Sequence, residues 1–167
     1  ALLKSMGFVK DFASLVYVVS HGSSSVNNPH FSAYDCGACC GRPGSVNARV
    51  ICHMANDSEV RSLLKERGIS IPSETRFVGA LHDTSRDEIV YYDENLLSEA
   101  QKLHHAKNSQ IFAESLKANA VERSRRFVLL DKKLPKEKVF QSVRNRSVSL
   151  FEPRPELNHA TNTLCIV

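Results

Sequence analysis

The stretch that decides the fold reads Leu15-Val16-Tyr17-Val18-Val19-Ser20-His21-Gly22. Its first five residues are apolar without interruption and rich in β-branched side chains, which predicts a strand buried on both faces, as in a parallel sheet. A histidine and a glycine close this strand. Because open α/β sheets bind ligands beyond the carboxyl ends of their strands, His21 stands where a functional group is expected.

Outward from that strand, helix and strand patterns alternate along the chain. The alternation predicts an α/β fold with a mainly parallel sheet and flanking helices. We expect strands at Thr75 to His82 and Ile89 to Tyr92, and helices at Leu2 to Phe12, Ser45 to Met54, Asp57 (as the cap) to Gly68, Asn95 to Arg126 and Lys136 to Arg146, with Pro153 and Pro155 in an extended segment.

Length and composition set the class of protein. The 167 residues are 42% apolar and 24% charged, which is typical of one globular domain. No apolar run approaches the roughly 20 residues of a membrane-spanning helix, and residues 1–10 do not resemble a secretory signal. Five cysteines, an odd number, favour reduced or metal-bound thiols in the cytoplasm over a disulfide framework.

Both ends of the chain predict continuation. Ala1 is not an initiator methionine, and Thr163 to Val167 has the pattern of an apolar strand. Chain ends usually lie exposed at the surface of a domain. We therefore interpret residues 1–167 as a single α/β domain fragment of a longer protein.

A long loop after His21 holds the candidate metal ligands. It runs to Gly44 with little periodicity, and loops of this length are usually functional. Imidazole and thiolate are zinc ligands, so His21 and Cys36 could converge on one ion. Taken alone, a histidine at a strand end is more often structural, and Cys36-x-x-Cys39 without a second cysteine pair also fits redox chemistry. Cys52 and Cys165 are expected in the core.

Several motifs together resemble the DabA-type inorganic carbon transporter subunits, over nearly the whole chain. These are large soluble proteins that contain a β-carbonic-anhydrase-like zinc domain and pair with a membrane subunit. The matching segments are His21-Gly22-Ser23, Asn27-Asn28-Pro29, Asp35-Cys36-Gly37-Ala38-Cys39, Asn47-Ala48-Arg49-Val50, Ala80-Leu81-His82-Asp83-Thr84 and Arg154-Pro155-Glu156-Leu157.

The resemblance implies a zinc site that this chain completes only in part. The ligands that this chain would give to the zinc are His21 and Cys36, and Cys39 is expected to be structural. The remaining Cys and Asp ligands belong to an upstream Cys-x-Asp-x-Arg strand end, and no Cys-x-Asp occurs in this sequence. The chain is then the carboxyl-side part of a partial β-carbonic-anhydrase-like domain, inactive by itself and with no catalytic residue assigned. Cys40 replaces a glycine that is usual in the family.

The function implied by the resemblance is zinc-dependent hydration of CO₂, coupled by a cation gradient to inorganic carbon transport. The partners are a proton- or cation-conducting membrane subunit and the substrates CO₂ and bicarbonate, and the location is peripheral, on the cytoplasmic face of the inner membrane. Two other classes stay open: a non-catalytic metal-binding or partner-binding module, and a Cys-x-x-Cys redox protein.

Other polar groups have simpler interpretations. Ser23 to Ser25 lack the strand–turn–helix setting of a serine nucleophile and are expected to donate supporting hydrogen bonds. His82-Asp83 either approach the site or cap their strand. His104 and His105 are adjacent on a helix and point about 100° apart, which is poor for chelation. We expect both to occupy solvated or packed positions at which substitution is nearly silent.

Residues 123–146 form a basic segment. It contains nine Lys or Arg residues against Asp131 and Glu137, a local charge of +7 in a chain of net charge +4. This pattern fits a solvated helix face, or a docking surface for the missing domain, a membrane partner or anionic lipid. Nucleic acid is not expected as a partner, because only Phe127 and Phe140 interrupt the charges.

Overall fold

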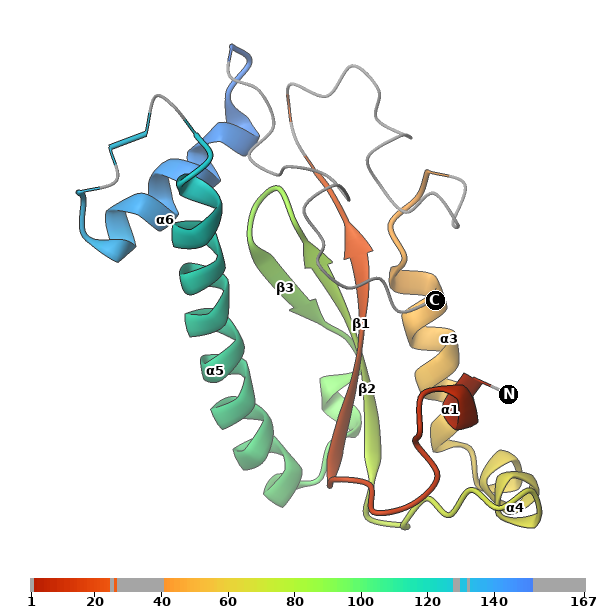
Figure 1. Cartoon of the computed structure of the whole chain (residues 1–167). Coiled ribbons are helices and arrows are strands. Elements are labelled where there is room, and N and C mark those ends of the chain that lie inside the picture. The colour runs from red at the N-terminus through yellow and green to blue at the C-terminus, as the bar shows by residue number, and fades with distance from the viewer. Residues whose placement is uncertain (1, 25, 27–40, 128–129, 132, 152–167) are drawn as a thin grey trace.

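A three-stranded sheet lies between helix α3 on one side and helix α5 on the other in the computed structural model (Figure 1). The structure describes residues 2–24, 26, 41–127, 130–131 and 133–151. The strands are β1 (Leu15–Gly22), β2 (Arg76–Asp83) and β3 (Glu88–Tyr91), in the order β1-β2-β3.

The sheet is mixed, so the prediction of a mainly parallel sheet is not confirmed. β1 and β2 are parallel, with Leu15 opposite Arg76 and Gly22 opposite Asp83, whereas β2 and β3 are antiparallel. Only residues 84–87 separate β2 from β3. A parallel crossover needs a dozen or more residues, so this short connection can make only a hairpin.

The strand buried on both faces is β2 rather than β1. In β2, Phe77, Val78 and Ala80 are at most 4% exposed, whereas Val19 of β1 is 44% exposed. β2 is the central strand of the three and β1 stands at an edge. The apolar run in β1 therefore predicted the strand correctly, but its predicted burial on both faces was wrong.

The helices follow their predicted signals with shifted ends. Asp57 accepts hydrogen bonds from the backbone N–H groups of Glu59 and Val60, and Gly68 follows that helix with a φ of 78°. The predicted first helix stops early, before Gly7, whose φ is 77°. The helices are α1 (Leu2–Ser5), α3 (Ser45–Asn56), α4 (Ser58–Glu66), α5 (Glu99–Ser124) and α6 (Lys136–Asn145), with 3₁₀ turns η2 (Glu94–Leu96) and η3 (Arg146–Val148).

The long helix begins four residues later than predicted. Ser98 caps it by accepting a hydrogen bond from the Gln101 backbone, and the Gln101 side chain accepts one from the Ser98 N–H. This reciprocal pair satisfies two backbone donors that a helix start leaves open. η2 precedes the cap as a separate turn, which is why the apolar periodicity at Leu96 and Leu97 does not belong to α5.

Three hydrophobic clusters hold these layers together. On the α3 face, Phe77 packs with Cys52 and Ala55, which confirms Cys52 as a core residue. On the α5 face, Leu15 and Val78 pack with Leu97, and Tyr17 and Tyr91 lie against them. A third cluster joins the end of α5 to α6: Ala120, Phe127, Leu130, Val139 and Val143. No described helix is long and apolar enough to cross a membrane.

Candidate site at the carboxyl end of the sheet

His21 lies one residue before the end of β1, in register with His82 of β2. Neighbouring residues of a parallel pair project from the same face. That face is the one toward α5, because Tyr17, which shares it with His21, contacts His105 and Phe112 of α5. The two histidines therefore share one end of one face of the sheet, and each is half-buried.

The loop that leaves β1 after Gly22 returns to the same place. The Gly44 N–H donates to the His21 carbonyl at 2.9 Å, directly before α3 begins. The backbones approach closely here, since a Cβ on residue 44 would meet the Ser20 Cβ at 3.0 Å, a tight contact that glycine avoids. The start and the end of the predicted metal loop are thus both fixed beside His21.

The other predicted ligand lies outside the described residues. Cys36 belongs to the range 27–40, as do Cys39 and Cys40, and Cys165 falls in the range 152–167. Among the residues that the structure describes, no group of three or more His, Cys, Asp or Glu side chains could hold a metal ion. The pairing of His21 with Cys36 stays a prediction.

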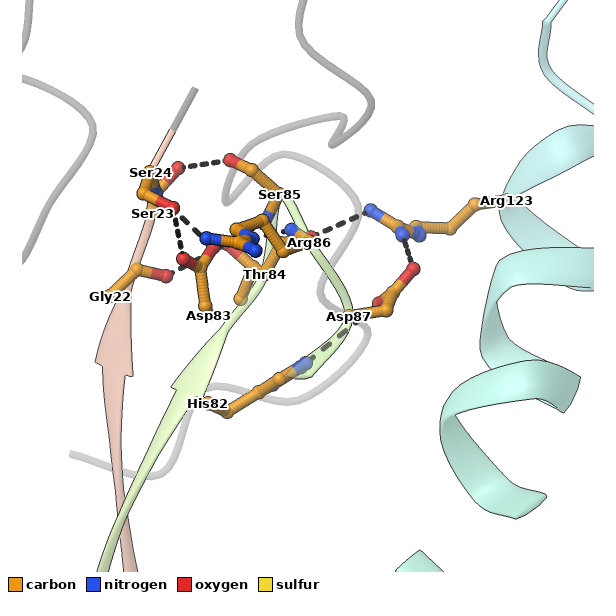
Figure 2. Close-up of polar contacts among 10 residues, drawn as sticks. All are labelled: Gly22, Ser23, Ser24, His82, Asp83, Thr84, Ser85, Arg86, Asp87 and Arg123. Carbon is orange, nitrogen blue, oxygen red and sulfur yellow. Dashed lines mark hydrogen bonds and ion pairs between the residues drawn. The ribbon is translucent and has the colours of Figure 1, made fainter. Parts of the chain in front are cut away.

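Asp83 organises the turn between β2 and β3 (Figure 2). Its Oδ1 accepts hydrogen bonds from the backbone N–H groups of Ser24, Ser85 and Arg86 at 3.1–3.2 Å, and its Oδ2 accepts from the Ser24 hydroxyl. The hydroxyls of Ser23 and Ser85 are 2.6 Å apart. Ser23 and Ser24 therefore tie the exit of β1 to this turn, and Asp83 caps the strand. Ser25 lies outside the described residues, and a supporting role of these serines at a metal site stays a prediction.

A buried ion pair lies behind the same turn. Arg123 of α5 donates to the carboxylate of Asp87, whose side chain is fully buried, and to the Thr84 carbonyl at 3.1 Å (Figure 2). Asp87 has a φ of 51°, a left-handed conformation that aspartate tolerates better than most residues. His82 Nε2 is 3.8 Å from Asp87 Oδ1, beyond hydrogen-bond distance. The turn is thereby fastened to the end of α5.

The basic segment is partly structural, which its sequence pattern did not reveal. Besides Arg123, Arg144 forms an ion pair with Glu88 of β3, and the guanidinium of Arg146 lies 4.6 Å from the centre of the Phe127 ring. Arg146 is 8% exposed. These three charges hold α5 and α6 together and against the hairpin, so they belong neither to a solvated face nor to a docking surface.

Comparison with known proteins shows the family of the chain. The family model described as "Probable inorganic carbon transporter subunit DabA" matches residues 1–167. The chain belongs to this family. It is 61% identical over 166 residues to a protein of that name from Azotobacter vinelandii, covering 99% of this chain and 20% of the relative. It is 56% identical over 161 residues to one from Nitrosospira multiformis, covering 96% and 18%.

The chain spans about a fifth of the length of the curated DabA relatives that it matches. A third, "DabA 2" from Sorangium cellulosum, is 48% identical over the whole chain, which covers 16% of that protein. No solved structure matches the chain. The resemblance found in the loop motifs is therefore confirmed as family membership.

A second polar cluster of this DabA-family chain lies on the α5 face, nearer the middle of the sheet. His105 Nδ1 is 2.8 Å from the Tyr17 hydroxyl, and His105 Nε2 is 2.9 Å from Glu94 Oε1. The Asn108 amide donates to the same hydroxyl at 3.4 Å. Burial raises the pKa of Tyr17 and raises that of Tyr91, which packs on the His105 ring, to about 12.

This cluster decides between the two positions expected for His105, solvated or packed, in favour of the packed one. His105 is only 7% exposed and both of its ring nitrogens lie at hydrogen-bond distance from partners, so it is not a silent surface position. His104 is exposed, in agreement with the prediction. Adjacent helix positions point in different directions, and the sequence alone did not show which of the two faces the sheet.

Proposed function

We propose that this chain is part of a zinc-dependent, carbonic-anhydrase-like subunit of an energy-coupled inorganic carbon transporter. In this proposal His21 and Cys36 hold a zinc ion together with a Cys and an Asp from the upstream part of the subunit. The observation that carries it is the closure of the loop on itself, with Gly44 bound to the His21 carbonyl beside a half-buried imidazole. Membership of the family and the names of the relatives support the proposed role in transport.

The donor set fits zinc. An imidazole and a thiolate supply half of a tetrahedral N/S shell. The backbone around His21 is fixed from both sides, by the pairing of β1 with β2 and by the Gly44 N–H, so the imidazole is presented by a rigid strand end. Rigid presentation lowers the cost of assembling a shell whose other members come from elsewhere.

A bound zinc ion would supply the Lewis acidity that makes a water molecule nucleophilic toward CO₂ near neutral pH. The chain's own contribution is positional. Asp83 engages three backbone N–H groups and keeps the turn beside His21 in one shape, while the Arg123–Asp87 pair fixes that turn to α5. In the proposal these contacts keep the backbone next to His21 in place.

The proposal also includes a membrane partner. The relatives are named as transporter subunits, and no described helix of this chain crosses a membrane. A proton- or cation-conducting membrane subunit would then hold the protein on the cytoplasmic face of the inner membrane, where it converts CO₂ to bicarbonate.

The test uses the full-length subunit in a host whose growth without added CO₂ depends on it. His21→Ala and Cys36→Ser are expected to abolish both zinc content and growth, because zinc with an incomplete shell loses its position and its effect on water. Cys39→Ser and the exposed His104→Ala serve as matched controls that retain both. Melting curves and complex formation with the membrane subunit separate loss of zinc from loss of folding.

Two outcomes would contradict the proposal. A folded, zinc-free Cys36→Ser subunit that supports full growth would show that the site does not act in the reaction. Tight, stoichiometric zinc held by four ligands within the isolated 167-residue chain would show that the ligand set is wrong. That isolated chain is expected to bind zinc weakly and to lack carbonic anhydrase activity.

A further inference from the structure

Helix α3 leaves part of the sheet uncovered on its own face. It packs over β1 and β2, with Cys52 and Ala55 against Phe77. Val90 of β3 pairs with Leu81, which places it on this α3 face of the sheet, and it is 48% exposed. A cavity of about 380 Å³ lies between α3, the first half of β2 and the segment that follows β3.

Solvent-exposed aliphatic side chains surround this cavity. Val46, Val50 and Leu96 line it and are between 51% and 69% exposed. Gly79 forms part of its floor, where α3 comes so close that a Cβ would meet Arg49 atoms at 3.4 Å. Single exposed aliphatic residues are ordinary, but a group of them around one cavity indicates an interaction surface. We call this surface, comprising Val46, Val50, Arg76, Gly79 and Leu96, the α3–β3 groove.

The sequence of α3 supports a second partner for this helix. Ala48, Cys52 and Ala55 form the buried stripe against the sheet. Val46, Val50 and Met54, spaced four residues apart, form another apolar stripe that is more than half exposed. A helix that is apolar on more than one face is normally covered on more than one face.

The charges in the groove favour an acidic partner. Arg49 is already bound to Asp93, at 2.7 Å and 3.0 Å, and this contact lowers the pKa of Asp93. Arg76 also lines the cavity, and no described residue forms an ion pair with it. The amide of Asn56 is occupied by the Phe77 backbone. The groove therefore presents aliphatic walls and two guanidiniums, of which Arg76 is in no ion pair although it acts from farther off on the Asp93 carboxylate that Arg49 binds.

We propose that the α3–β3 groove docks an amphipathic helix from another part of the same subunit, with apolar residues on Val46 and Val50 and an Asp or Glu side chain at Arg76. The chain makes up 16–20% of its DabA relatives, so most of such a subunit lies outside these residues. Helices cover a sheet face side by side, each about 10 Å wide, and the position next to α3 is the one over β3. This proposal rests on family membership and does not depend on the zinc site.

Accessibility of a single thiol in the full-length subunit tests the proposal. Val50→Cys is labelled with a maleimide under native conditions and after denaturation, and label on residue 50 is quantified by fragmentation in the mass spectrometer, which separates it from label on Cys52. We expect native labelling to be slower by at least about tenfold, since the position opens only when the docked helix leaves. The protection should persist without the membrane subunit and on dilution.

Each alternative occupant gives a different result. Labelling of the native subunit as fast as that of the denatured one would overturn the proposal, because the groove would be open. Protection that disappears on dilution would assign the groove to a second copy. Protection that requires the membrane subunit would assign it to that partner. Each of these results overturns docking within the subunit.

A charge reversal tests the acidic part of the proposal. In the Val50→Cys background, Arg76→Glu places a carboxylate against the partner's carboxylate and should restore fast labelling, whereas Arg76→Lys should keep the protection. Zinc content and growth should persist in Arg76→Lys, so a failure of docking is distinct from a failure of the metal site. Equal protection in Arg76→Glu, with an unchanged melting temperature, would overturn the assignment of an acidic residue.

Discussion

Two polar clusters flank the sheet, one in the middle of its α5 face and one at its carboxyl end, and they are built differently. In the middle, His105 has a partner at each ring nitrogen and lies among the rings of Tyr17, Tyr91 and Phe112. At the carboxyl end, His82 Nε2 is 3.8 Å from Asp87, and the carboxylates of Asp83 and Asp87 bind backbone N–H groups and Arg123 instead. The middle cluster joins side chains across layers, whereas the end cluster fixes backbone turns.

That difference separates packing from function. A histidine with both nitrogens engaged and rings around it has little capacity left for a ligand, so the middle cluster joins α5 to the sheet. At the carboxyl end the network holds the two segments that flank His21, the start of its loop and the β2–β3 turn. We therefore expect substitutions at the end to alter the site and substitutions in the middle to alter stability alone.

The largest effect is expected at Arg123. Arg123→Ala should lower the free energy of unfolding of the 167-residue chain by about 3–5 kcal/mol, because Asp87 stays buried without its counter-charge. Urea denaturation followed by circular dichroism measures it. Arg125→Ala is the matched control: its ion pair with Glu122 is exposed, and the change should stay within about 0.5 kcal/mol.

A double substitution sharpens that test. Removing both charges, in Asp87→Ala with Arg123→Ala, should recover part of the loss, since no unpaired charge then stays buried. A loss below about 1 kcal/mol for Arg123→Ala alone would mean that water reaches Asp87 and that the end cluster is looser than its burial indicates.

The next effect in size belongs to the middle cluster. His105→Ala should cost roughly 2–3 kcal/mol, because the Tyr17 hydroxyl loses the nearer of its two hydrogen-bond partners and the ring contacts are lost. His104→Ala, one residue away and exposed, should change stability by less than about 0.5 kcal/mol in the same urea titration. Equal effects at the two positions would contradict the assignment of His105 as the inward-facing histidine.

A smaller effect is expected at Asp83. Asp83→Asn keeps a carbonyl oxygen for the three backbone N–H groups and should cost roughly 0.5–1 kcal/mol, while Asp83→Ala leaves them without a partner and should cost about twice as much. Hydrogen exchange at the Ser85 and Arg86 amides reports the contact directly. Unchanged exchange in Asp83→Ala would show that water replaces the carboxylate without loss.

The sequence predicted local features well and long-range features poorly. The cap at Asp57, the left-handed Gly68 and the strand at β1 depend on neighbouring residues, and each was predicted correctly. The burial of β2 over β1, the inward turn of His105 and the pairing of Arg123 with Asp87 depend on which elements become neighbours. Residue patterns record helix and strand periods but not the order of strands in a sheet.

One long-range feature was nevertheless within reach of the sequence. Residues 84–87 leave no room for a crossover between the strands on either side, so an antiparallel hairpin could have been inferred from loop length alone. His21 does lie near the end of β1, as predicted, and its role as a metal ligand stays a prediction. The role of Ser24 and of Asp83 required the fold, because they are 59 residues apart in the chain.

The smallest effect at neutral pH is expected at Tyr91, and it grows only in alkali. Burial, followed by the influence of Tyr17 and Glu94, raises the pKa of Tyr91 from the ordinary value of 10.0 to about 12. Below pH 10 the folded and unfolded chains both hold the proton, and stability does not depend on it. Between pH 10 and about 12 the unfolded chain releases the proton while the folded chain keeps it, so stability falls as pH rises. Tyr91→Phe should leave the urea midpoint at pH 7 nearly unchanged and should flatten its fall between pH 9 and pH 11.

Tyr17→Phe is the contrasting variant, because the Tyr17 hydroxyl is bonded to His105 and its loss should lower the midpoint at pH 7 as well. An equally steep alkaline fall in Tyr91→Phe would mean that the middle cluster admits water, and its assignment as closed packing between α5 and the sheet would no longer hold.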